Sequence, residues 1–122
     1  MTLTEIRKVM NEFGLEEIYD DICDETYFII RHPLFDKETE AGSFLVYRKE
    51  EIWLYDQLEC DIGKWYLCGW DGDFDTSCDE QKVEYIKCLT EEKLRNKLSA
   101  VMEKVKQTAM EVKLDKMKED FK

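Results

Sequence analysis

The spacing of hydrophobic residues predicts a helix at the start of the chain. Thr2 and Glu5 have the T-x-x-E spacing of a capping box, so the helix is expected to begin at Leu3. Its apolar residues recur on one face, and Gly14 ends or bends it. Residues 15–23 keep helical spacing, which predicts a second short helix or a continuation of the first one.

The middle of the chain changes to the shorter period of β-strands. Aromatic and β-branched residues concentrate in five short runs, as is typical of strands: residues 27–31, 43–48, 52–55, 64–70 and 81–89. The second and third runs are close enough to form a hairpin. Five strands at such short spacing favour an antiparallel meander.

A long helix is predicted at the C-terminal end. Thr90 is a suitable N-cap, and Glu91 and Glu92 follow in the first turn, near the positive end of the helix dipole. No glycine or proline interrupts the chain from there to Phe121. The sequence therefore predicts one α+β domain over residues 1–122, with an N-terminal helix, an antiparallel sheet of about five strands and a long C-terminal helix.

The C-terminal helix carries two apolar stripes. One is a core-facing stripe made by Leu94, Leu98, Val101, Val105 and Val112. The other points about 150° away on a straight helix and consists of Met110, Leu114, Met117 and Phe121. Either the helix bends near residues 107–109, or residues 108–122 leave the domain as a helical tail. Such a tail is expected to be frayed or folded back, to form a homodimer, or to contact another target.

Charge adds a second feature to this outline. The net charge is -11, from 29 acidic and 18 basic residues, and nearly all the excess lies in two windows. Residues 11–26 contain seven acids and no base, and residues 70–84 contain six acids and one lysine. Such clusters serve solubility or dock on a basic protein surface. The candidate partner-binding residues are Glu16, Glu17, Asp20, Asp21, Asp24, Asp71, Asp73, Asp75, Asp79 and Glu80, with Trp70 and the second helical stripe.

The stretch WDGDFDTSCDE at residues 70–80 superficially resembles a calcium loop. Asp71, Asp73 and Asp75 fall at the first, third and fifth positions of an EF-hand loop. Thr76 then replaces the required glycine, and Lys82 replaces the bidentate glutamate. We interpret the stretch as an acidic hairpin turn, ahead of a weak cation site or a true calcium sensor, and expect no metal and no cofactor.

Other chemistry is poorly represented in the sequence. His32 is the only histidine, which excludes a catalytic triad and a multi-histidine metal site, so a structural role is expected. The five cysteines lack C-x-x-C spacing, which favours reduced thiols in the cytoplasm. No apolar run reaches the ~18 residues of a membrane span. The strand aromatics lack interleaved bases, so direct nucleic-acid binding is not expected. We predict no catalytic residues and no enzyme activity.

In size, acidity and lack of catalytic motifs, and in clustered acids such as EEIYDDICDE, the chain resembles small acidic inhibitors encoded by phages and other mobile elements. Anti-CRISPR proteins and DNA mimics belong to this class. The resemblance implies a cytoplasmic inhibitor that occupies the basic groove of a bacterial nuclease or other defence protein. The alternatives are a bacterial immunity protein that neutralises a basic toxin and, behind it, a small hydrolase.

Overall fold

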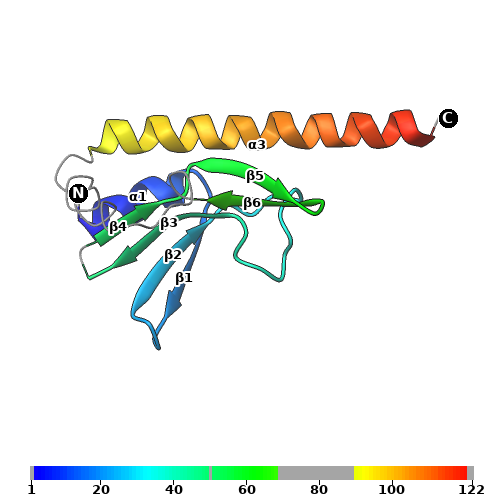
Figure 1. Ribbon diagram of the computed structural model, residues 1–122. Coiled ribbons are helices and arrows are strands. Elements are labelled where there is room, and N and C mark those ends of the chain that lie inside the picture. Colours follow the sequence, from blue (N-terminus) through cyan, green and yellow to red (C-terminus); the bar gives the residue numbers. More distant parts are fainter. Residues whose placement is uncertain (1, 50, 69–89, 121–122) are drawn as a thin grey trace, which may run out of the picture.

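The computed structural model describes residues 2–49, 51–68 and 90–120 (Figure 1). The elements follow in the order α1 (Leu3–Glu12), β1 (Glu16–Asp20), β2 (Glu25–Ile29), β3 (Ser43–Arg48), β4 (Glu51–Leu54), β5 (Gln57–Asp61), β6 (Lys64–Cys68) and α3 (Glu91–Asp120). The predicted α+β class, with an N-terminal helix, antiparallel strands and a long C-terminal helix, is confirmed.

Helix α1 begins at the predicted cap. The Thr2 hydroxyl oxygen accepts a hydrogen bond from the backbone N–H of Glu5 at 3.2 Å. The face formed by Ile6, Val9 and Met10 is buried in the core. Gly14 then adopts a φ of +78°, in the left-handed region that favours glycine, and this turns the chain out of the helix.

The helix predicted for residues 15–23 is wrong, because this segment contains strand β1. Beyond the turn at Gly14, β1 forms an antiparallel hairpin with β2, in register from Glu16 opposite Ile29 to Asp20 opposite Glu25. Pairing with β2 gives the backbone of this segment hydrogen-bond partners. A helix of only two turns would be marginally stable in isolation. The apparent helical stripe does not coincide with burial, since Leu15 is buried whereas Ile22 is exposed.

The strands form two sheets rather than one meander. Strands β1 to β4 make a four-stranded antiparallel sheet in sequence order, and β5 and β6 make a separate hairpin. The predicted hairpin between residues 48 and 52 is present as β3 and β4. Strand β5 was not predicted, because its sequence QLECD is mostly polar. The strand predicted at residues 81–89 lies outside the described residues.

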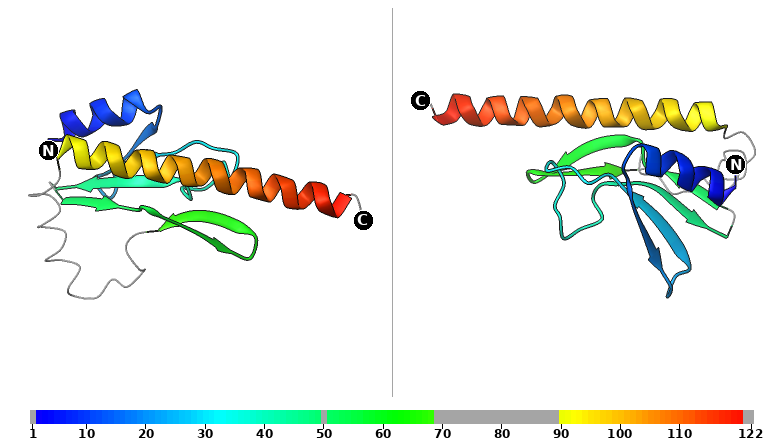
Figure 2. Two further views of the ribbon diagram at one scale, coloured as in Figure 1. Left: turned by 90° about the horizontal axis from the view of Figure 1, so that it is seen from above. Right: turned by 180° about the vertical axis from the view of Figure 1, so that it is seen from behind.

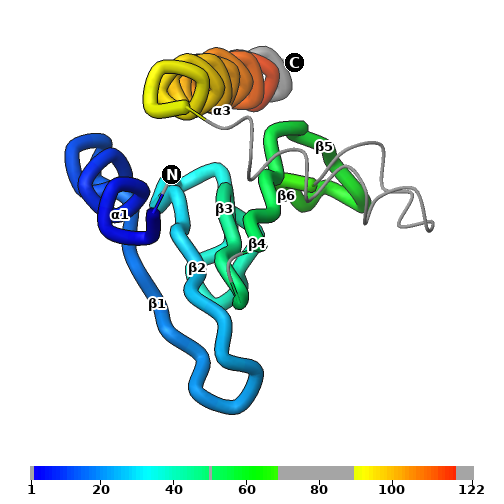
Figure 3. The backbone as a smooth tube through the Cα atoms, turned by 90° about the vertical axis from the view of Figure 1, so that its left-hand side faces the viewer, coloured from blue at the N-terminus to red at the C-terminus, as the bar shows by residue number. Residues whose placement is uncertain are grey.

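Both helices lie on the same side of the four-stranded sheet, with α3 running alongside α1 and over β5 (Figures 2 and 3). The core between these layers joins the helices to the strands. It includes Leu94, Leu98, Val101 and Val105 of α3 together with Phe28 and Phe44 of the sheet. A backbone hydrogen bond of 2.8 Å from Leu67 to Ala41 ties the β5–β6 hairpin to the chain that precedes β3.

Helix α3 continues past the core without interruption at residues 107–109, where a bend was one of the two alternatives. Val105 is the last buried residue among its described side chains. The final turns extend beyond the strands (Figure 1). Three residues of the second stripe are about half exposed, namely Met110 at 58%, Leu114 at 55% and Met117 at 48%. Phe121 lies outside the described part of the chain.

Candidate protein-binding surface

The structure divides the acidic window at residues 11–26 into a neutralised part and a free part. The chain has four arginines, and each forms an ion pair with an acid of this window. The pairs are Arg7–Glu17 at 2.7 Å, Arg31–Glu16 at 2.5 Å, Arg48–Glu25 at 3.5 Å and Arg95–Glu12 at 2.5 Å. Of the seven acids, four therefore have an arginine partner within the chain.

These ion pairs connect the acidic residues 11–26 to other elements of the protein. The Arg7–Glu17 pair is bidentate, with a second contact of 3.0 Å between Nη2 and Oε2. The hydrogen bond from Arg31 lowers the pKa of Glu16, so that carboxyl group is ionised at neutral pH. Because the paired side chains remain partly exposed, screening by water keeps the contribution of each pair to stability small. Glu16 and Glu17, both predicted to bind a partner, are thus already engaged within the chain.

The three remaining acids lie at the hairpin tip, which we define as residues 19–24 between β1 and β2. Asp20 Oδ1 accepts hydrogen bonds from the backbone N–H groups of Ile22 at 3.0 Å and Cys23 at 3.4 Å. Asp24 Oδ1 accepts the Tyr19 hydroxyl at 2.7 Å, and this bond raises the pKa of Tyr19. In the described part of the chain, Asp20, Asp21 and Asp24 form no ion pair with a base.

The hairpin tip also exposes apolar side chains. Ile22 is 91% exposed and Tyr19 is 58% exposed. The hairpin projects away from both helices, so that the tip stands clear of the body (Figures 1 and 3). The arrangement places three carboxylates around one isoleucine and one aromatic ring. This combination suits contact with a basic surface that also offers an apolar patch.

Three further predicted binding residues of the described chain are not part of this surface. Met110, Leu114 and Met117 are exposed on the last turns of α3, and this end of the helix lies away from the β1–β2 hairpin (Figure 1). The second acidic window and its neighbour lie outside the described residues: Trp70, Asp71, Asp73, Asp75, Asp79 and Glu80. Phe121 also lies outside the described residues.

Cys23 and His32 are two side chains of the described residues with chemistry to consider. Cys23 is exposed, but the charge of Asp20 is the largest of the effects that raise its pKa, which keeps the thiol protonated and weakly nucleophilic. His32 Nδ1 accepts the Leu34 backbone N–H at 3.1 Å, a structural use of its ring. Across residues 2–49, 51–68 and 90–117, no group of three or more histidine, cysteine or acidic side chains could hold a metal ion.

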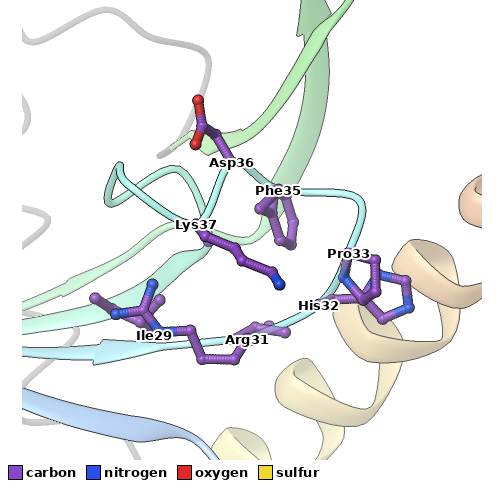
Figure 4. A pocket seen from close by; sticks show the side chains of 9 residues that line it. Ile29, Arg31, His32, Pro33, Phe35, Asp36 and Lys37 are labelled. Atoms are coloured by element: carbon purple, nitrogen blue, oxygen red, sulfur yellow. The ribbon is translucent and has the colours of Figure 1, made fainter.

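Two hollows lie on either side of the loop between β2 and β3, and the sequence patterns did not indicate either. The smaller one, of about 300 Å³, is bordered by Arg31, Pro33, Phe35 and Lys37 (Figure 4). The larger one, of about 480 Å³, lies between residues 33–41 and the β5–β6 hairpin. The loop is held close to β2, since a Cβ atom on Gly42 would come within 2.3 Å of the Ile30 carbonyl oxygen.

Comparison of the chain with protein-family models, with curated proteins and with solved structures found no match. Within the described helices, none is long and apolar enough to cross a membrane.

Proposed function

We propose that the protein acts without catalysis by binding a basic surface of another protein through its hairpin tip. The observation that carries this proposal is the distribution of the arginines. They pair with four acids of the first window and leave Asp20, Asp21 and Asp24 around the exposed side chain of Ile22. The acids of this window that have no arginine partner are therefore concentrated on one projecting turn.

This arrangement suits recognition of a basic groove. Carboxylates on a projecting turn accelerate association with a basic surface by long-range attraction, which weakens as salt is added. Ile22 and Tyr19 supply the apolar contact that holds the complex after encounter. The acids of residues 70–84 add to the net negative charge of the chain. A nucleic-acid-binding groove of a bacterial nuclease or other defence protein is the surface that fits best, and the site of action is the bacterial cytoplasm.

The same charges would also serve an immunity protein, whose target is a basic toxin. Gene neighbourhood separates the two classes, because a toxin gene beside this one indicates immunity, whereas phage genes indicate an inhibitor of defence.

The test begins with a pull-down from bacterial lysate, with captured proteins identified by mass spectrometry. Association kinetics with the captured target are then measured for a variant in which Asp20, Asp21 and Asp24 are all changed to Asn. Asparagine keeps the oxygen acceptors that shape the turn. We expect association to slow about tenfold at low salt and to lose most of its salt dependence.

The matched control changes Glu103 and Glu111 to Gln and Asp115 to Asn, three exposed acids on α3. It alters the net charge by the same amount while leaving the hairpin tip intact. We expect its association rate to remain within about twofold of the parent rate, because charges far from the contact act weakly. Equal effects of the two triple variants would refute a role for the hairpin tip.

The exposed stripe on α3 supports a separate proposal, a homodimer formed through the C-terminal helix. Met110, Leu114 and Met117 would otherwise leave a row of apolar side chains in water. Analytical ultracentrifugation of the parent and of Leu114→Lys tests the dimer. A parent that stays monomeric at high protein concentration would rule out this interface.

A further inference from the structure

The larger hollow has a preformed shape. It is bounded on one side by residues 33–41 and on the other by the β5–β6 hairpin. The hydrogen bond from Leu67 to Ala41 joins the two sides at 2.8 Å. Asp36 fixes the loop through its Oδ1 atom, which accepts the Glu38 backbone N–H at 3.0 Å. A ligand entering this hollow would need little reorganisation of the chain.

Aromatic side chains form much of the lining. Phe35 is 5% exposed, and Trp65 and Tyr66 of β6 are half-buried. All three border the hollow. The faces of aromatic rings attract cations, and tryptophan is the strongest of them in this respect.

Two carboxylates complete the lining, those of Asp36 and Asp61, while Lys64 is a single base on the same rim. The carboxylate of Asp36 points away from the smaller hollow, whereas the ammonium group of Lys37 points into it (Figure 4). The two neighbouring charged side chains of the loop therefore point in different directions, Lys37 into the smaller hollow and Asp36 away from it. The larger hollow is net negative in a protein whose total charge is -11.

We propose that this hollow receives an arginine side chain of the basic partner. The planar guanidinium stacks on the ring of Trp65, and its N–H groups pair with the carboxylates of Asp36 and Asp61. The idea that the arginine comes from a basic partner rests on the proposed function. The pocket that receives it depends on this chain alone. The protein would then contact its partner at two places, the hairpin tip and an arginine pocket beside the β5–β6 hairpin.

The pocket is tested with a small probe and no partner. N-acetyl-arginine amide is titrated into the ¹⁵N-labelled protein and followed by NMR, with N-acetyl-citrulline amide as the neutral control of the same shape. We expect saturable shifts of the Trp65 indole N–H and of backbone signals at residues 33–41 and 61–66. The citrulline compound is expected to give no saturable shift, because it lacks the charge that the ring and carboxylates recognise.

Substitutions then locate the site. Asp36→Asn and Asp61→Asn should each weaken binding of the arginine probe about threefold, the usual scale for one exposed ion pair. Asp115→Asn, an equal charge change on the exposed part of α3, should leave it unchanged. Asp36→Asn retains the oxygen that accepts the Glu38 N–H, so the loop keeps its shape.

Equal shifts with arginine and citrulline, shifts confined to the hairpin tip, or equal affinities in all three variants would each overturn the pocket. Because the probe needs no partner, these outcomes leave the proposed function standing if the hairpin-tip variant still slows association. Conversely, saturable arginine binding in a protein whose hairpin-tip variant binds its target normally would overturn the hairpin-tip mechanism alone.

Discussion

Replacing Ile62 by asparagine is expected to stabilise the protein. Ile62 and Gly63 are the central residues of the β5–β6 turn, closed by the pair Asp61 and Lys64, and their φ angles are +49° and +73°. Positive φ at both central residues is the requirement of a type I′ turn, for which Asn-Gly is the favoured sequence. An ordinary L-residue in this region costs about 1–2 kcal/mol, and a β-branched side chain is an outlier there.

The magnitude follows from the exposure of the side chain. Ile62 is 93% exposed, so its replacement removes almost no buried apolar surface. The change in the free energy of unfolding should therefore reflect mainly the relief of backbone strain, about 1 kcal/mol. In a chain of 122 residues, this gain corresponds to an increase in Tm of about 3–5 °C.

Thermal and urea unfolding followed by far-UV circular dichroism measure the effect. Ile22→Asn is the matched control, because Ile22 is 91% exposed in the β1–β2 turn but does not have a positive φ. Its Tm should change by less than about 1 °C, as for other exposed sites without special backbone geometry. A Tm of Ile62→Asn that is unchanged or lower, or an equal rise in both variants, would refute the argument from backbone strain.

Three further predictions concern the tail, a thiol and calcium. Deletion of residues 108–122 should leave the Tm within a few degrees of the parent value, because the buried stripe of α3 ends at Val105; cooperative unfolding lost on deletion would instead make the tail part of the core. Cys23 should react slowly with iodoacetamide at neutral pH and faster in Asp20→Asn, which removes the main cause of its raised pKa; mass spectrometry of the Cys23 peptide gives both rates, and equal rates would contradict this cause. Calorimetry should detect at most weak calcium binding, because residues 70–80 lack the EF-hand glycine, and a submicromolar site would disprove the turn interpretation.

Local sequence patterns determined the features that depend on neighbouring residues. The capping box placed the start of α1 correctly, because its hydrogen bond spans only three residues. Thr90 likewise caps α3, with its hydroxyl oxygen accepting the Lys93 backbone N–H at 3.2 Å. The boundaries of β3 were also predicted from its run of buried aromatic and β-branched residues. The angle between the two stripes indicated that Met110 and Leu114 would be exposed unless the helix bent, and the structure shows an uninterrupted helix.

Tertiary structure decided the features that depend on distant residues. Residues 15–23 became a strand because β2 offered a pairing edge, which helical spacing in one segment cannot reveal. The arginines that neutralise the first acidic window stand 10, 15, 23 and 83 positions from their partners. Counting charges along the chain located the acidic window. Only the fold determined which of its carboxylates are paired and which three remain at the hairpin tip, because ion pairing depends on distance in space.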